Sequence, residues 1–180
     1  EFISWLDNEV LNNLSTGYSL SVTAEKSAKS ARESGFRPDA LAENYHDVYR
    51  LRTRTLSDLD KFQSWYQSGE KVYPEISITP TILKMWYCSD GGLSAGKVGR
   101  NQIQIRCSNE SDRIQNLVKL FNEIGFNPTV TNNNTRLIFT SDETEEFLRW
   151  IGEPAPGFEY KWESQSQKEY LTKKRKVYNR

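Results

Sequence analysis

Histidine, cysteine and methionine are all scarce in this chain of 180 residues. The single histidine, His46, excludes most His-rich zinc sites, and any Ser-His-Asp triad would depend on that one residue. The two cysteines, Cys88 and Cys107, are too few for a disulfide framework and are typical of an intracellular protein with reduced thiols. We therefore expect an intracellular protein whose chemistry depends on neither histidine clusters nor cysteine cross-links.

Long apolar stretches and an excess of one charge are also missing. The longest unbroken apolar run has four residues, 85–88, whereas a membrane-spanning helix needs roughly 18. We expect neither a membrane span nor an N-terminal signal peptide. The 24 Lys and Arg residues balance 24 Asp and Glu residues, so the chain as a whole is not a polybasic nucleic-acid binder. Aromatic residues make up 12% of the chain and supply core material that a disordered segment would lack.

Basic residues are nevertheless concentrated locally. Within residues 48–54, arginine occupies every second position, and a β-strand would send Arg50, Arg52 and Arg54 to one face. Three aligned arginines with no acid between them are typical of a DNA-facing surface. The alternative is a salt-bridged outer face of a sheet. A second basic cluster, at residues 173–176, lies in a polar tail.

An internal repeat of the order helix–strand–strand–helix organises the chain. Residues 60–65 resemble residues 145–150, with a Phe and a Trp offset by 85 positions in both cases. The expected strands are 18–23 and 49–55 in the first copy, and 128–131 and 135–140 in the second. An amphipathic helix precedes each pair. Residues 24–45 are expected to form a surface insertion in the first copy, with a short helix as one option.

The second copy has a further helix and strand in front of it. The helix opens at Thr79-Pro80 and ends at Asp90, before two glycines. The strand alternates Gln102, Gln104 and Arg106 with apolar residues, so these three polar side chains are expected on one face. Glutamine can read adenine and arginine can read guanine, which suggests DNA contacts for all three. The first copy has no counterpart of this helix and strand, and we expect that its beginning has been cut off.

Three segments together resemble single-chain LAGLIDADG homing endonucleases. Residues 83–91 (Leu-Lys-Met-Trp-Tyr-Cys-Ser-Asp-Gly) resemble the family's motif, a helix that ends in an acid and a glycine. Residues 69–80 contain Lys-x-x-Pro and Thr-Pro elements similar to the family's junction between two halves. Residues 158–161 (Phe-Glu-Tyr-Lys) resemble the element that closes the second half. The resemblance covers roughly residues 1–162.

This resemblance implies an α+β fold with two pseudo-symmetric αββαββα halves and antiparallel DNA-binding sheets. The implied domains are a truncated first half, 1–76, a second half, 77–162, and the polar basic tail, 163–180. It also implies that Asp90 holds Mg²⁺ or another divalent cation beside a scissile phosphate, with Lys71 and Lys161 nearby as catalytic residues. A carboxylate suits Mg²⁺, and phosphodiester hydrolysis needs an activated water and neutralisation of the developing charge.

We therefore expect a site-specific endonuclease for double-stranded DNA, encoded by a free-standing, intron-borne or intein-borne gene. A maturase that binds intron RNA and a non-catalytic DNA-binding protein of the same fold are the alternatives. An isolated Asp-Gly-Gly can also simply end a helix and open a turn, and Lys71 and Lys161 could be ordinary solvated lysines. A missing N-terminal segment or a second chain would complete the active site.

Overall fold

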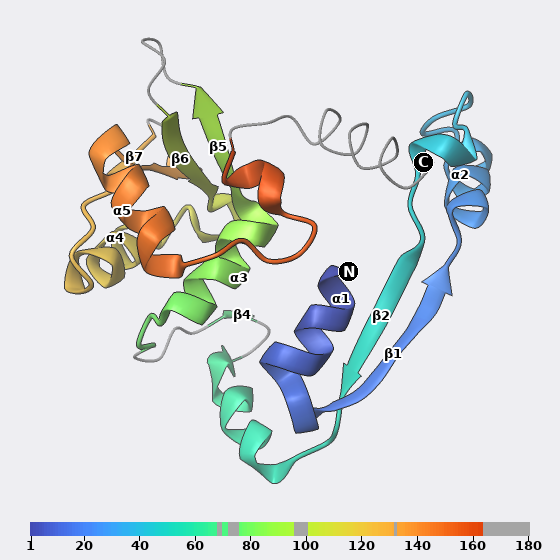
Figure 1. Cartoon of the computed structure of the whole chain (residues 1–180), viewed down its shortest axis with the longest axis horizontal. Helices are drawn as coiled ribbons and strands as arrows, with labels where there is room; N and C mark the ends of the chain where they lie inside the picture. The colour runs from blue at the N-terminus through green and yellow to red at the C-terminus, as the bar shows by residue number, and fades with distance from the viewer. Residues whose placement is uncertain (68–69, 72–75, 96–100, 132, 164–180) are drawn as a thin grey trace. The chain divides into compact units, whose positions relative to one another are not determined.

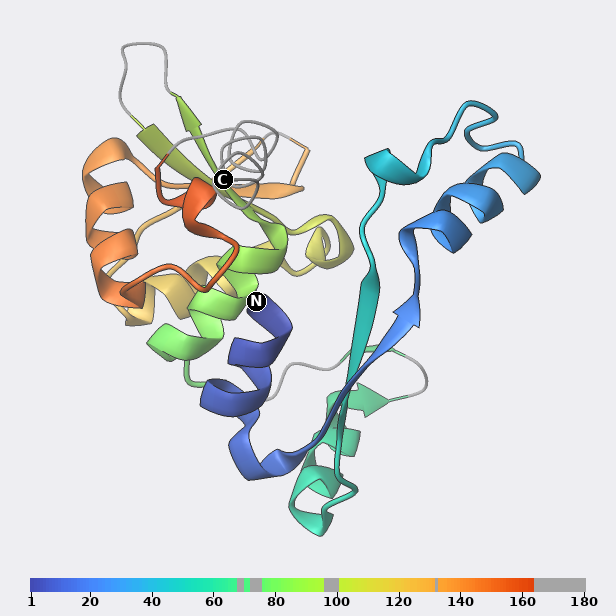
Figure 2. The same ribbon diagram turned by 45° about the vertical axis from the view of Figure 1, so that its right-hand side comes forward.

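Helices and antiparallel strands occur together along the chain, which gives a mixed α+β structure, as the sequence predicts. The computed structural model describes residues 1–67, 70–71, 76–95, 101–131 and 133–163. The chain divides into two compact units, Glu1–Val72 (unit 1) and Tyr73–Arg180 (unit 2). Figures 1 and 2 show their elements from two directions.

Unit 1 is built on a two-stranded antiparallel ribbon of β1 (Ser15–Val22) and β2 (Val48–Thr53) (Figure 1). A continuous helical segment leads into the ribbon, and a 3-10 helix and a short hairpin follow it. The remaining elements are α1 (Phe2–Trp5), the π-helix η1 (Leu6–Leu11), the 3-10 helices η2 (Asn12–Leu14), η3 (Ala42–Asn44) and η4 (Ser57–Trp65), β3 (Tyr66–Gln67) and β4 (Glu70–Lys71).

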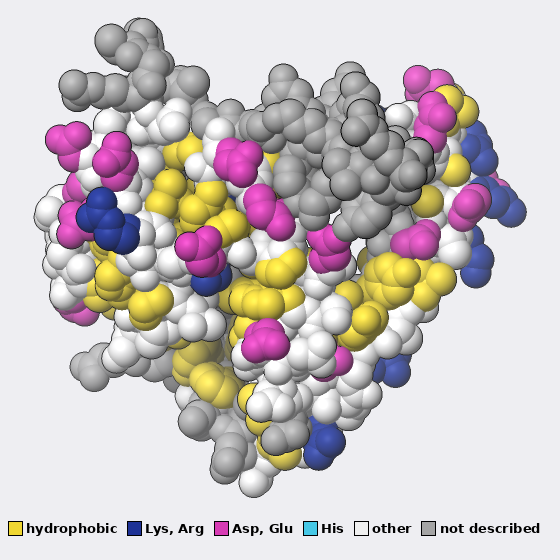
Figure 3. Space-filling view, viewed as in Figure 1, with side chains coloured by type: hydrophobic (Ala, Val, Ile, Leu, Met, Phe, Trp, Pro, Cys, Tyr) yellow, Lys and Arg dark blue, Asp and Glu magenta, His cyan; other side chains and the backbone are white. Residues whose placement is uncertain are grey.

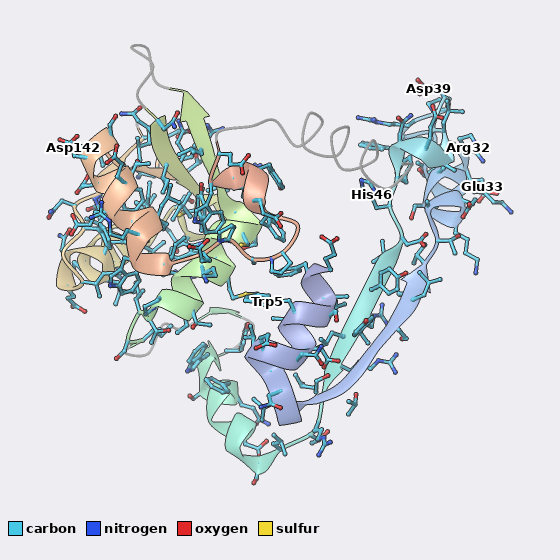
Figure 4. All side chains as sticks on the ribbon, viewed as in Figure 1. Trp5, Arg32, Glu33, Asp39, His46 and Asp142 are labelled. Carbon is cyan, nitrogen blue, oxygen red and sulfur yellow. The ribbon has the colours of Figure 1, made fainter. Side chains whose placement is uncertain are left out.

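The segment between β1 and β2 folds into a helix, α2 (Ala24–Glu33). The Thr23 side chain caps this helix by accepting a hydrogen bond from the Lys26 amide at 3.3 Å. In the last turn of α2, the Arg32 guanidinium donates a hydrogen bond to the Ala40 carbonyl. Figure 4 shows Arg32, Glu33, Asp39 and His46 at this end of the ribbon. The insertion expected at residues 24–45 therefore has a structure of its own.

Unit 2 contains a four-stranded antiparallel sheet in the order β5-β6-β8-β7. Three helices cover one face of this sheet (Figures 1 and 2). The elements are α3 (Pro80–Asp90), β5 (Gly91–Ala95), β6 (Asn101–Arg106), η5 (Ser108–Glu110), α4 (Ile114–Glu123), β7 (Thr129–Val130), β8 (Arg136–Ile138), α5 (Ser141–Ile151) and η6 (Glu159–Lys161).

The core of unit 2 lies between the sheet and its three helices. Ile103 and Ile105 of β6 and Leu137 of β8 point into it and are fully buried. Helices α3, α4 and α5 contribute apolar side chains at helical spacing, which bury one stripe of each helix. Among the fully buried helix side chains are Leu83, Tyr87, Phe121 and Phe147. Burying a side chain of this size stabilises the fold by about 1.5–3 kcal/mol. One face of the sheet is therefore committed to the core.

Two details of unit 1 differ from the sequence-based expectations. Strand β2 ends at Thr53, so Arg54 lies beyond the strand. Its amide donates to the Leu14 carbonyl at 2.8 Å, and its Nε donates to the Ser15 carbonyl at 3.3 Å. The segment 60–65, which the repeat matches to an α-helix, is instead part of the 3-10 helix η4. The prediction of three aligned strand arginines is therefore wrong for Arg54.

Residues 164–180, which include the basic cluster at 173–176, lie outside the described residues. In the described ranges, every helix is too short or too polar to cross a bilayer.

Candidate functional site

Helix α3 places Asp90 at its C-terminal end, and local sequence defines both ends of this helix. Thr79 caps the N-terminus, where its Oγ1 accepts from the Ile82 amide at 3.3 Å, and Pro80 occupies the first turn. Leu83 and Tyr87 bury the inner face of the helix. Asp90 itself is exposed at the last helical position.

Strand β5 begins immediately after Asp90, and this sharp change of direction requires a glycine. A Cβ atom on residue 91 would lie 2.1 Å from Cδ2 of Tyr87 and 2.6 Å from the Tyr87 carbonyl oxygen. Any larger side chain would therefore clash with the last turn of α3. A Cβ on Gly92 would meet nothing within 4 Å. Gly91 thus allows the chain to pass directly from the helix into the edge of the sheet.

The face of the sheet opposite the core is polar. Along β6, Gln102, Gln104 and Arg106 alternate with buried Ile103 and Ile105, as the sequence predicts. Ser94 and Gln102 are paired across β5 and β6, and Arg106 and Arg136 are paired across β6 and β8. Because paired residues of antiparallel strands point to the same side, Arg136 joins this polar face.

A shallow hollow of about 280 Å³ connects this polar face with the end of α3. The Arg136 guanidinium donates to Oε1 of Gln104 at 3.1 Å, which aligns both side chains. The Arg106 Nε donates to Oγ of Ser108 at 2.9 Å. The lining residues are Asp90, Gly91, Gly92, Leu93, Ser94, Gln104, Arg106 and Arg136. The hollow therefore combines one carboxylate with two guanidinium groups.

Arg136 was not among the site residues that the sequence indicates, although the strand that carries it was expected. The only signal was its place in the strand expected at 135–140, since the three apolar residues at 137–139 give no alternation. What the sequence does not give is the partner strand, and only the β6–β8 pairing places Arg136 opposite Arg106.

Asp90 is the acidic residue of this hollow, and its environment allows a metal to approach. Its Oδ2 accepts a hydrogen bond from Oγ of Ser89 at 3.0 Å. Within the described ranges, no three His, Cys, Asp or Glu side chains gather into a cluster that could hold a metal. One exposed carboxylate fits hydrated Mg²⁺, which keeps several waters and takes further ligands from substrate phosphates. It does not fit a metal cage built entirely from protein.

Lys161 lies beside this helix end, in η6. Its Nζ donates to the carbonyl oxygens of Cys88 and Gly91, each at 2.6 Å, and of Tyr87 at 3.2 Å. Burial lowers the pKa of Lys161, while the nearby Cys88 and Asp90 act in the opposite direction. The structure thus brings Lys161 and Asp90 to the same end of α3.

The other predicted residues belong to unit 1. Arg50 and Arg52 are exposed on β2, where Arg50 pairs with Ser19 of β1. Tyr18 and Leu20 lie on the opposite face of this ribbon, which is apolar. Figure 3 shows hydrophobic side chains along the ribbon and Lys and Arg side chains at one edge of it.

Lys71 is the second predicted lysine. Its backbone lies in β4 of unit 1, and its side chain lies outside the part of the chain that the structure describes.

The comparisons with known proteins identify no relative of this chain. The interpretation of the hollow therefore depends on its own geometry and on the resemblance of the three sequence segments. No protein-family model, no curated protein and no solved structure matches this chain.

Proposed function

We propose that this chain is a DNA endonuclease of the LAGLIDADG type, which binds double-stranded DNA and hydrolyses a phosphodiester bond with Mg²⁺. The observation that carries the proposal is the hollow that Asp90, Arg106 and Arg136 line together. A nuclease of this kind needs cationic groups for the phosphate and a carboxylate for the metal at one place.

The sheet provides the binding part of the proposed site. Arg106 and Arg136 are adjacent cations, and β6 and β8, both fully described, contain no acidic residue. Two like charges on directly opposite residues repel each other in the free protein. An anion such as a DNA phosphate relieves this repulsion, and guanidinium groups can bind it with two parallel hydrogen bonds. In this proposal Gln102 and Gln104, on the same face, would contact base edges.

The end of α3 provides the metal-binding part. In this proposal the exposed Asp90 carboxylate would hold Mg²⁺, and Arg106 and Arg136 would orient the phosphate. The metal, when bound, supplies an activated water and neutralises negative charge. Ser89 holds one carboxylate oxygen of Asp90 through its hydrogen bond, and Gly91 keeps the helix end open toward the sheet. Arg50 and Arg52 of unit 1 would add phosphate contacts elsewhere on the duplex.

The test separates binding from cleavage. A duplex that binds the chain is first selected from a randomised double-stranded library. Wild type, Asp90→Asn and Glu146→Gln are then compared on it with Mg²⁺ and with EDTA, with the two strands labelled separately. Glu146 is exposed on α5, outside the lining of the hollow, and serves as the matched control. We expect Mg²⁺-dependent strand cleavage that Asp90→Asn abolishes and Glu146→Gln preserves, with duplex binding retained in both variants.

Two results would contradict the proposal and favour an alternative. Duplex binding without cleavage or nicking in any metal, even when the N-terminal segment or second chain expected to complete the site is supplied, indicates a non-catalytic DNA-binding protein. Tighter binding to structured intron RNA than to any selected duplex indicates a maturase. Cleavage that is undiminished in Asp90→Asn would remove Asp90 from the mechanism.

A further inference from the structure

The Lys161 ammonium is surrounded by backbone carbonyl groups at the end of α3. An ammonium group has three N–H donors, and three carbonyl oxygens lie within hydrogen-bond distance of this one. They belong to Tyr87 (3.2 Å), Cys88 (2.6 Å) and Gly91 (2.6 Å). These contacts match the donor capacity of the group one to one. A lysine that contacts a phosphate would need to give up at least one of them.

Helix α3 also donates a hydrogen bond to the backbone of Lys161. The Tyr87 hydroxyl donates to the Lys161 carbonyl oxygen at 2.8 Å, while Lys161 Nζ donates to the Tyr87 carbonyl. The Gly91 amide completes the turn by donating to that same Tyr87 carbonyl. The ring centroids of Tyr87 and Phe158 lie 5.9 Å and 5.5 Å from Nζ of Lys161. Lys161 is therefore held on several sides and has little freedom to turn toward a ligand.

Two of the three acceptors, Tyr87 and Cys88, lie in the last turn of α3, although the Tyr87 carbonyl also accepts from the Gly91 amide, and Gly91 itself begins β5. The last carbonyls of an α-helix have no intrahelical donor and carry the negative end of the helix dipole. A cation satisfies both needs, and Lys161 supplies it from a position 70 residues away in sequence from Gly91. The acceptors include the residues two before and one after Asp90, so the backbone on both sides of Asp90 is fixed by one ammonium group.

We propose that Lys161 is a positioning residue, which fixes the backbone around Asp90 and makes no contact with phosphate. The inference deepens the proposed function, because it assigns how the metal-binding carboxylate is held in place. It also changes the role that the resemblance implies for this lysine. The phosphate contacts fall instead to Arg106 and Arg136.

The first measurement uses the free chain and needs no DNA. A hydrogen-bonded ammonium exchanges its protons slowly, so we expect the Lys161 NH₃⁺ group to give its own ¹H–¹⁵N NMR signal, which Lys161→Met removes. The exposed Lys119 should give none at the same temperature and pH. We expect this signal to keep its position when the selected duplex is added. Absence of a Lys161 signal, or a shift of it upon duplex binding, would overturn the positioning role.

The second measurement tests the helix end itself. In Lys161→Met the three carbonyls lose charge-assisted hydrogen bonds, so hydrogen exchange of the Gly91 amide should rise about tenfold or more. The amide of Phe139, which donates to the Ile103 carbonyl on the sheet, should change little, and Lys119→Met should change neither amide. Equal effects on Gly91 and Phe139 would indicate a general loss of stability and contradict the proposal. Unchanged Gly91 exchange would contradict it as well.

The third measurement separates this inference from the proposed function. If Lys161 acts through Asp90, Lys161→Met lowers the rate of strand cleavage but leaves the salt dependence of duplex binding unchanged. If it contacts phosphate, the slope of log K against log salt becomes shallower by about 0.9, which would overturn the proposal. The binding slope can be measured whether or not the chain cleaves DNA, so failure of the nuclease assignment does not obscure the outcome.

Discussion

Arg106 and Arg136 lie directly opposite each other on neighbouring antiparallel strands, with both side chains on the exposed face of the sheet. Like charges at directly opposite positions destabilise a sheet. Gln104 compensates in part by accepting a hydrogen bond from Arg136. Two guanidinium groups side by side on an exposed face can bind an anion, which relieves their repulsion.

This pair leads to a prediction in which binding and stability respond differently. Arg136→Ala removes one phosphate contact, so duplex affinity should fall and the slope of log K against log salt should become shallower by about 0.9. Because the substitution also removes a repulsion, the free energy of unfolding should stay within about 1 kcal/mol of wild type. Salt titrations by fluorescence anisotropy and thermal melting measure the two effects. Arg149→Ala, an exposed arginine on α5, is the control and should alter neither. A large loss of stability in Arg136→Ala would show that its role is structural.

The two glycines after Asp90 should differ sharply in their tolerance of a methyl group. A Cβ at Gly91 would overlap the Tyr87 ring, whereas a Cβ at Gly92 would meet no atom within 4 Å. Gly91→Ala should therefore lower the free energy of unfolding by about 1–3 kcal/mol. Gly92→Ala should cost less than about 1 kcal/mol, because it lies in a strand where alanine is acceptable. Urea unfolding of both variants compares them directly, and equal stabilities would contradict the close packing of α3 against β5.

Much of unit 2 follows from its sequence, because its hydrophobic periods are clear. The stripe of Ile114, Leu117 and Phe121 predicts α4, and the alternation around Ile103 and Ile105 predicts β6. The local pattern does not predict strand β5, which only the αββαββα order of the family resemblance implies. Its sequence, Gly-Gly-Leu-Ser-Ala, contains almost no hydrophobic pattern, and it is a strand because it pairs with β6 from Gly91 to Ala95. Such pairing is a tertiary contact that a local pattern does not encode.

The repeated Phe and Trp show a second limit of local pattern. Around Phe147, Thr140 and Glu143 form a capping box, and the Phe147 side chain is fully buried, so α5 is a regular α-helix. Around Phe62, the helix begins after Leu56 without a side-chain cap, and Phe62 remains 37% exposed. Similar residues therefore give an α-helix in one unit and a 3-10 helix in the other. Capping and burial, which the repeat does not contain, decide between them.

The residue pattern predicts the parts of the candidate site, whereas only the family resemblance predicts that Lys161 lies near Asp90. The helix end at Asp90 and the polar side of β6 can be expected from sequence, whereas the contact between Lys161 and the α3 carbonyls spans more than 70 residues. Packing of η6 against α3 creates this contact, and no spacing rule along the chain predicts it. The same is true of Arg136, which reaches Arg106 only through the sheet.

Thr144 provides a test of a buried polar contact that positions α5 on the sheet. Its side chain is 2% exposed, and its Oγ1 accepts a hydrogen bond from the Ile103 amide at 3.0 Å. Thr144→Val keeps the shape but leaves that amide without an acceptor, so the free energy of unfolding should fall by about 1–3 kcal/mol. Thr144→Ser keeps the hydroxyl and loses one methyl group, which should cost about 1 kcal/mol. Chemical unfolding distinguishes the two, and a valine variant as stable as the serine variant would show that the hydrogen bond contributes little.

The arginines of unit 1 should divide into two classes when duplex binding is measured. Arg50 and Arg52 are exposed on β2, and we expect each alanine substitution to reduce the salt slope by about 0.9 as one phosphate contact is lost. Arg54 lies beyond the strand, and its Nε is engaged with the Ser15 carbonyl. Arg54→Ala should therefore change the salt slope little and instead loosen the start of β1, which hydrogen exchange of the Gly17 amide, bonded to Oγ of Ser15, can report. Arg50→Lys and Arg52→Lys retain the charge and should keep most of the slope. If all three alanine variants reduce the slope equally, Arg54 reaches DNA despite its contact with β1, and the ribbon presents three arginines to the duplex.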